Sequence, residues 1–364
     1  MSTLQNALTF EPTLVRQTDP SSFSAVEVCA EALAAFRAGW VNGTVPESSV
    51  WSIHAQESQK GLLRILETGT ADQLSHFMAN IHERPVLRGY DQHALITRGL
   101  DNDAKRNKLH RSLLFVALSR LAAGLGTVRH FKPQQPDNFE YTSEDQINDM
   151  VLGIAEALGL KGSLPTSGIG AIGLETPLGL LSYRHIFALG YLREIRNVLQ
   201  SRSYDQIVEI GGGLGRVGFH IARDLGLPLT IIDLPVVGVT QFHFLRGNGI
   251  TTSMWTDDLP QSGEARLVNA FADFDPDQFK NALFVNFDSL VEMGRSTQDA
   301  YFNLIKDAGG DLLSVNHECQ KTMTREGHLQ NWDLVRFEEW GYRAGPRHMF
   351  WERDGWVSRL FRRS

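Results

Sequence analysis

The sequence predicts an α/β protein in which a mainly helical N-terminal part precedes a mostly parallel sheet of about seven strands. Before residue 200, apolar residues recur every three or four positions, as in amphipathic helices, and strand-like alternation is scarce. From residue 206, short β-branched runs alternate with helical stretches, which is typical of parallel strands joined by crossover helices. We therefore expect a helical cap and oligomerisation domain at residues 1–180 and an α/β domain at 181–364.

Length and composition limit the class of protein. A chain of 364 residues suits about two domains. The net charge is −7 and no block of lysine and arginine occurs, so we expect neither a nucleic-acid nor a membrane partner. Two cysteines far apart, Cys29 and Cys319, suit a reducing compartment. No signal peptide and no apolar run long enough for a membrane span is present, which predicts a cytoplasmic protein.

The first 180 residues are predicted to be helical with two exceptions. Residues 1–22 contain Pro12 and Pro20, and we expect no element there. Residues 159–180 are rich in glycine, and we interpret them, including the G-x-G-x-x-G stretch Gly168–Gly173, as a long and functional connecting loop. Helical spacing begins at Ser24 and ends near Gly39 or Gly43, and it also covers 52–69, 71–81, 105–125 and 145–158.

The second part alternates between helices and strands. A helix at 181–200 leads into a strand that ends at Ile210, and helical spacing resumes from Leu214 to Leu225. Asp354-Gly355 favours a hairpin within 347–361. The other predicted strands are 229–233, 266–270, 282–287 and 311–316, and the other helices are 236–247 and 298–308.

A glycine-rich turn between the first two of these strands organises the domain. Gly211, Gly213 and Gly215 allow a sharp turn and place no Cβ between the backbone and a ligand. The N–H groups of the following helix point toward the same ligand. Asp233 ends the next strand, where a carboxylate accepts both hydroxyls of a ribose. These features predict a ligand of the adenosine type.

Spacing distinguishes between two such ligands. Gly213–Gly218 matches G-x-G-x-x-G but starts two residues after the strand ends, whereas in dinucleotide-binding folds the first glycine follows the strand directly. Counted from the strand end, Arg216 replaces the third dinucleotide glycine. The pattern Glu209-x-Gly-x-Gly-x-Gly instead resembles motif I of class I methyltransferases, in which the acid faces the ammonium of S-adenosylmethionine. We favour that cofactor over a nicotinamide dinucleotide and over a purely structural turn.

Several segments together are similar to the bacterial sugar O-methyltransferases that use S-adenosylmethionine. They are residues 87–92, the glycine-rich 166–180, EIGGGLG with IDLP, FVNFDSLVEM at 284–293 and RDGWV at 353–357. The resemblance implies a Rossmann-like class I methyltransferase domain and does not extend to residues 1–80. It also implies cofactor contacts from Glu209, Gly211, Gly213, Gly215, Asp233, Leu234 and Phe271, and substrate contacts from Asp288 and Glu292.

Methyl transfer to a hydroxyl requires a base, and its identity stays open. Plant-type O-methyltransferases have a His-Asp pair after the fourth strand, where this chain has Phe287-Asp288. His317, just beyond the fifth strand, is the first candidate for the base and Asp288 is the second. Glu318 and His328 are further substrate-side candidates, and Tyr183 is a candidate for the cofactor site. Each of these side chains has an ordinary packing or surface role as its alternative.

Other interpretations remain at this stage. Asp288 and Glu292 have the oxygen ligands that suit a divalent cation, although a solvated or helix-capping role is favoured, and no zinc spacing occurs. The expected activity is methylation of a hydroxyl on a small metabolite, a sugar or a natural-product intermediate. The alternatives are methylation of nitrogen or carbon, or a homologue that binds the cofactor without methylating. We expect a homodimer formed through the helical half.

Overall fold

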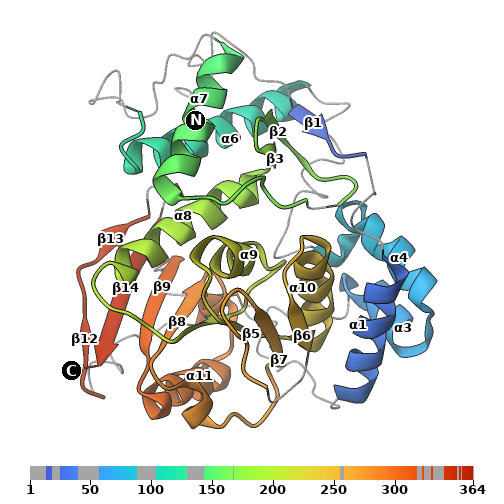
Figure 1. The fold of residues 1–364 in the computed structure, drawn as a ribbon, viewed down its shortest axis with the longest axis vertical. Helices are drawn as coiled ribbons and strands as arrows, with labels where there is room; N and C mark the ends of the chain where they lie inside the picture. Colours follow the sequence, from blue (N-terminus) through green and yellow to red (C-terminus); the bar gives the residue numbers. More distant parts are fainter. Residues whose placement is uncertain are drawn as a thin grey trace.

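The computed structural model describes residues 14–18, 25–39, 57–87, 104–128, 143–166, 168–254, 258–317, 322–323, 329–330, 340–350, 352–353 and 355–363 (Figure 1). Within these ranges the strands form a nine-stranded sheet, a three-stranded sheet and a two-stranded ladder. The two-stranded ladder consists of β10 (Thr322–Met323) and β11 (Leu329–Gln330). No helix among the described residues has both the length and the apolar character that crossing a membrane requires.

The nine-stranded sheet confirms the predicted mostly parallel α/β architecture. Six adjacent strands, which reach one edge of the sheet, run parallel, and the three strands at the other edge pair antiparallel. In spatial order the strands are β12 (Tyr342–Ala344), β14 (Trp356–Arg363), β9 (Asp311–His317), β8 (Ala282–Phe287), β4 (Gln206–Ile210), β5 (Leu229–Asp233), β7 (Ala265–Asn269) and β6 (Thr252–Met254), with β13 (His348–Met349) paired to β14.

The predicted strands differ from the observed ones in small ways. β7 begins and ends one residue before the predicted 266–270, and the parallel edge strand β6 was not predicted. The predicted C-terminal hairpin is present, because β13 and β14 pair antiparallel across the turn. β12 extends the same edge.

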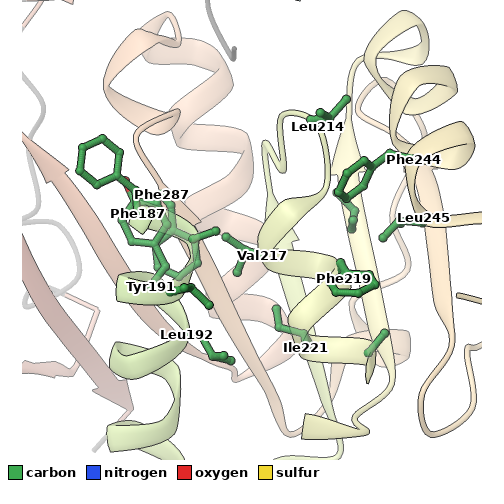
Figure 2. Close-up of a cluster of buried hydrophobic side chains, with 14 of the residues drawn as sticks. Phe187, Tyr191, Leu192, Leu214, Val217, Phe219, Ile221, Phe244, Leu245 and Phe287 are labelled. Atoms are coloured by element: carbon green, nitrogen blue, oxygen red, sulfur yellow. The ribbon is translucent and has the colours of Figure 1, made fainter. Parts of the chain in front are cut away.

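Burial on both faces explains the continuous apolar runs of the central strands. Every residue of β4 and β8 is buried. Successive residues point to opposite faces, so that Ile207 belongs to one apolar cluster and Val208 to another. Among the helices that follow residue 180, α8 (Tyr183–Leu199), α9 (Arg216–His220) and α10 (Pro235–Gly247) contribute to the first cluster, and α11 (Arg295–Ala308) contributes to the second. Figure 2 shows part of the first cluster.

The chain changes direction across the sheet at β4. From β4 it proceeds to β5 on one side and later returns to β8 on the other side. In open parallel sheets, ligands bind outside the carboxyl ends of the strands at such a switch point. The topology therefore directs attention to the residues that follow β4 and β8.

The N-terminal helices pack on the α/β part rather than standing apart. They are α1 (Val26–Gly39), α3 (Lys60–Thr68), α4 (Ala71–Ala79), α6 (Ala104–Gly124) and α7 (Glu144–Leu158). Local signals define their ends: Thr70 forms a capping box for α4, and Ser143 caps α7. α1 contacts α10, and α6 contacts α8 (Figure 1). Because their buried residues join the first cluster, the boundary at residue 180 stays a prediction.

The interpretation of residues 159–180 as a loop is wrong, and so is the expectation of no element within 1–22. β2 (Ile172–Thr176) and β3 (Gly179–Leu181) form an antiparallel hairpin, and β1 (Leu14–Arg16) pairs with β2. Gly173 lies so close to β3 that a Cβ there would be 2.4 Å from the Leu181 carbonyl oxygen. The glycines that permit this close approach and the turn also interrupt the alternation of apolar and polar residues. The two strands were therefore not recognised in the sequence.

Several helical segments differ from their predicted bounds, and some of the short turns are irregular. The predicted helix from Leu214 to Leu225 is divided into α9 and a π-helical turn, Ile221–Leu225. The predicted helices 181–200 and 298–308 are α8 and α11, with ends shifted by at most three residues. Short 3₁₀ turns are Ile81–Glu83, Pro85–Leu87, Pro276–Phe279 and Leu290–Glu292.

Candidate active site

A cavity of about 350 Å³ lies at the carboxyl ends of β4, β5, β7 and β8. This volume suits one small ligand or cofactor. Of the residues predicted from the sequence, those that line the cavity are Glu209, Gly211, Gly213, Asp233, Leu234, Phe271, Asp288 and Glu292. Gly215, Tyr183 and His317 are described but lie outside its wall. Glu318 and His328 lie outside the described residues.

The glycine loop between β4 and α9 requires its glycines for two different reasons. Gly211, Gly213 and Gly215 have φ values of 74°, 58° and 91°, which disfavour any side chain. A Cβ on Gly211 would also lie 2.3 Å from Ser289 Oγ, which donates a hydrogen bond to the Ile210 carbonyl oxygen at 2.9 Å. Gly215 caps α9 instead of facing the cavity. The loop therefore presents bare backbone to the cavity and packs closely against the end of β8.

Glu209 places a carboxylate in the cavity wall where it is 2% exposed. Its Oε2 has no hydrogen-bond partner among the described residues. Burial, together with the nearby charge of Asp233, raises the pKa of Glu209 to about 8. A buried carboxylate without a cation is unfavourable, so this position is complementary to an ammonium group on a ligand.

Asp233 ends β5 and is held by three donors. Its Oδ1 accepts the Leu234 N–H at 2.8 Å, and its Oδ2 accepts from Gln241 Nε2 at 2.7 Å and from the Gly213 N–H at 3.3 Å. Burial raises its pKa to about 7, although these hydrogen bonds oppose the shift. Each carboxylate oxygen has two lone pairs, so the fixed carboxylate retains the capacity to accept hydroxyl donors.

Sequence reasoning missed Gln241. Its Nε2 also donates to the Gly213 carbonyl oxygen at 3.0 Å and so ties the glycine loop to Asp233. Gln241 is completely buried on α10, a helix whose other buried residues are mostly apolar. A polar side chain among the apolar residues of a predicted helix was the signal in the sequence that could have pointed to Gln241. Tyr301 and Thr297 of α11 also line the cavity and carried no motif.

Asp288, which follows β8 and lines the cavity, is the centre of a polar cluster. Its backbone has a φ of 64°, an unusual value for a residue other than glycine. Its Oδ1 accepts from Trp356 Nε1 at 2.9 Å, and its Oδ2 accepts from Arg353. The Arg353 guanidinium lies 3.5 Å from the centre of the Trp356 ring, and Arg184 Nη1 lies 3.7 Å from Oδ2. Arg353 and Trp356 thereby contact a residue of the cavity wall.

His317, at the end of β9, belongs to the same neighbourhood without lining the cavity. Its ring meets Trp356 edge-on, with centroids 5.3 Å apart. Burial lowers the pKa of His317, although the nearby Asp288 opposes the shift. The imidazole is therefore neutral near pH 7, which is the protonation state of a general base. Trp356 and Asp288 lie beside it.

Aromatic rings from α8 and β8 line the cavity next to Asp288. Tyr191 stacks on Phe287, with centroids 4.4 Å apart and an interplanar angle of 5°. Phe350 stacks on Tyr191 as well, with a centroid distance of 4.9 Å. Figure 2 shows Phe187, Tyr191 and Phe287 grouped together on one side of Val217. Tyr183, a predicted cofactor contact, packs on Phe187 at 4.6 Å, outside the cavity wall.

A buried relay connects α8 with α9 behind the cavity. His185 Nε2 lies 2.8 Å from His220 Nε2, and His220 Nδ1 lies 2.6 Å from Asp224 Oδ2. Neither imidazole is exposed. Burial lowers the pKa of both rings, with Asp224 opposing the shift at His220. Only one hydrogen fits between two neutral rings, and His220 then donates to Asp224 while His185 donates to His220.

Neither a family model nor a curated protein matches the chain. Solved structures do resemble part of it. The methyltransferase domain of bacterial CtHen1-CN is 15% identical, covering 48% of this chain and 97% of that chain, with a TM-score of 0.33. The N-methyltransferase NodS from Bradyrhizobium japonicum, in complex with S-adenosylhomocysteine, is 17% identical, covering 50% and 87%, with a TM-score of 0.33.

A TehB-like SAM-dependent methyltransferase from Corynebacterium glutamicum is 14% identical, covering 48% of this chain and 88% of that chain, with a TM-score of 0.34. With identities and TM-scores this low, these similarities carry no argument about what the chain binds or does. Among the described residues, no three His, Cys, Asp or Glu side chains come close enough to hold a metal ion.

Proposed function

We propose that the chain is an S-adenosylmethionine-dependent methyltransferase that acts on a hydroxyl group of a small metabolite. One observation carries the proposal: a single cavity is lined by the bare loop Gly211–Gly213, the unpaired carboxylate of Glu209 and the fixed carboxylate of Asp233. An adenosyl amino acid is complementary to this set, with an ammonium for Glu209 and ribose hydroxyls for Asp233. Leu234 and Phe271 offer apolar contacts for an adenine ring.

The test of the cofactor uses ligand-induced stabilisation. A ligand that binds only the native state raises the melting temperature. S-adenosylmethionine and S-adenosylhomocysteine are expected to raise it and NAD is not. Asp233→Ala is expected to abolish the shift, because the variant removes the proposed acceptor of the ribose hydroxyls. Stabilisation by NAD alone would overturn the assignment.

S-adenosylmethionine supplies an electrophilic methyl group, and the chain must align the acceptor and remove its proton. The polar groups around Asp288 in the cavity wall support a hydroxyl acceptor. His317 is neutral near pH 7 and is the first candidate for the base, with Asp288 as the second. The resemblance of the 284–293 and 353–357 segments to sugar O-methyltransferases supports a sugar or a natural-product intermediate as the acceptor.

A second candidate, methylation of nitrogen, is favoured by one observation. Asp288 already accepts hydrogen bonds from Arg353 and Trp356, and His317 does not line the cavity. A neutral amine needs little base catalysis, so neither residue would then be required. Mass spectrometry of hydroxylated and amine acceptors incubated with isotopically labelled cofactor separates the two. Turnover that survives His317→Asn combined with Asp288→Asn would indicate the amine.

We also infer that the chain forms a homodimer through its helical half. Two large apolar side chains on that half support the inference: Leu113 on α6 and Leu152 on α7 are 39% and 44% exposed. Light scattering of the purified chain tests it. A mass of one chain at micromolar concentration would contradict the proposal, and Leu152→Glu is expected to shift a dimer toward monomer.

A further inference from the structure

The helix α8 contacts the turn between β13 and β14, and this contact is built around a glycine. Gly190 lies in the interior of α8, where glycine is disfavoured relative to alanine. A Cβ at this position would lie 2.8 Å from Phe350 Cζ and 3.2 Å from Glu352 Cδ. The missing side chain therefore leaves room on the helix for two residues of the turn.

A buried ion pair ties the same turn to α8. Arg193 Nη1 donates to Glu352 Oε1 at 2.6 Å, and the side chain of Glu352 is completely buried. Arg193 Nη2 also donates to Glu194 Oε1 at 2.8 Å, so two carboxylates share one guanidinium that is 8% exposed. Buried ion pairs often add little net stability compared with apolar side chains, but they can fix one arrangement of the segments that carry them.

Further contacts hold the turn on both sides of this pair. The Phe350 ring stacks on Tyr191 with a centroid distance of 4.9 Å and meets Phe187 at 6.5 Å. Ser358 Oγ donates to Glu194 Oε2 at 2.6 Å. Residues 187, 191 and 194 are spaced by four and three, so they lie on one face of the helix. We call the α8 residues that contact the turn the seat: Phe187, Gly190, Tyr191, Arg193 and Glu194.

The seat holds the residue that precedes Arg353 in the chain. Arg353 donates to Asp288 in the cavity wall, and its guanidinium lies 3.5 Å from the centre of the Trp356 ring. Because Glu352 and Arg353 are adjacent, fixing the first limits where the guanidinium of the second can lie. Asp288 and Trp356 both lie beside His317, the first candidate for the base.

We propose that Gly190 and Arg193 are positioning residues for the acceptor side of the cavity. By seating the turn between β13 and β14, they keep Arg353 on Asp288, next to the proposed base. This proposal rests on the function proposed above. It predicts that disturbing the seat changes the surroundings of His317 and leaves binding of the cofactor unchanged.

An NMR titration of His317 in the ligand-free protein measures the effect, with its signal assigned from His317→Asn. Glu352→Ala removes the tie between the turn and the seat, and Gly190→Ala displaces the turn without altering any charge. Both variants are expected to raise the pKa of His317, because burial and the charge of Arg353 lower it while Asp288 raises it. The wild-type titration is the reference.

Both variants are expected to fold. In Glu352→Ala the buried guanidinium keeps Glu194 as its partner, and in Gly190→Ala the new residue is the better helix former. Glu352→Gln retains an oxygen that accepts from Arg193, so it is expected to restore most of the wild-type pKa.

The control is Arg202→Gln, which removes an ion pair with Asp311 at 3.0 Å, at the opposite end of β9 from His317. It should leave the pKa of His317 unchanged, and all variants should bind S-adenosylhomocysteine within about twofold of the wild type. An unchanged pKa in both Glu352→Ala and Gly190→Ala, even with a lower melting temperature, would make the seat purely structural and overturn the proposal. A wild-type chain that does not bind S-adenosylhomocysteine would overturn the proposed function, while the titration would still decide whether the seat holds the turn.

Discussion

Gln241 Nε2 lies 2.7 Å from Asp233 Oδ2 and joins a helix side chain to the carboxylate that ends β5. The same nitrogen donates to the Gly213 carbonyl oxygen at 3.0 Å. One buried amide thereby fixes the relative positions of the glycine loop and the proposed ribose acceptor. Both contacts come from a residue that no motif marks.

Gln241→Met retains the volume of the side chain and removes both hydrogen bonds. We expect the dissociation constant for S-adenosylhomocysteine to rise by about tenfold, because a hydrogen bond to a charged group is worth about 1.5–3 kcal/mol. Calorimetry measures the change. Thr240→Val, one residue earlier on α10, removes a hydroxyl that bonds only within its own helix and serves as the control. Unchanged affinity in Gln241→Met would show that Asp233 needs no support from α10.

Gly211→Ala tests whether the loop is limited by crowding as well as by φ. The substitution places a Cβ 2.3 Å from Ser289 Oγ at a φ of 74°. The matched control is Gly249→Ala, with a φ of 81° and no atom within 4 Å of its Cβ. The control is expected to cost about 1–2 kcal/mol of unfolding free energy, the usual penalty of the left-handed region.

Gly211→Ala is expected to cost clearly more than this, because Ser289 must move from its hydrogen bond to Ile210. Urea unfolding at one pH gives both values. Equal losses in the two variants would mean that the end of β8 yields freely and that the loop is not held by it.

Glu209→Gln is expected to stabilise the ligand-free protein and to weaken binding of the cofactor. The pKa of Glu209 is raised from 4.5 to about 8, so the folded state keeps a proton that the unfolded chain releases between these values. Stability of the ligand-free wild type therefore falls as pH rises through this window, and the amide removes that contribution. The melting temperature at pH 8 should rise in the variant.

The same variant should bind S-adenosylhomocysteine more weakly and methylthioadenosine equally well, because only the former has an ammonium. Asp233 has a raised pKa too and remains in the variant, so part of the pH dependence should persist. A variant that is less stable than wild type at pH 8 would contradict the interpretation of Glu209 as a destabilising buried charge.

The His185–His220 pair should make stability depend on pH in the opposite direction. Both pKa values lie below the ordinary 6.5. Below that pH the unfolded chain binds protons that the folded pair excludes, so this contribution to stability is complete above pH 6.5 and declines as pH falls. Burial opposes ionisation of Asp224, but hydrogen bonds from His220 and Arg223 lower its pKa, which places its own effect at a lower pH.

Unfolding free energies of wild type and His185→Phe between pH 7 and pH 5 provide the measurement. We expect a smaller decline in the variant, since a buried group that must stay neutral has been removed. His76→Gln, at an exposed position on α4, is the control and should follow the wild type. Parallel curves for all three proteins would exclude the relay as a source of acid sensitivity.

The sequence by itself determined the parallel sheet, its loop of glycines and the two acids that flank it. Strands buried on both faces need continuous apolar runs, and a turn with positive φ needs glycine, so both leave local traces that can be read without coordinates. Asp233 was predicted because it ends such a run, and Glu209 because it precedes the glycines in a pattern that resembles motif I of class I methyltransferases.

Only the tertiary structure decided which distant side chains meet there. Gln241 reaches Asp233 from the next helix, and Arg353 and Trp356 reach Asp288 from a hairpin far along the chain. The hairpin of β2 and β3 was not predicted, because its close pairing requires glycines and a glycine-rich segment indicates a loop in the sequence. Contacts between segments remote in sequence depend on how helices and strands pack, and packing leaves no periodic signal in a single segment.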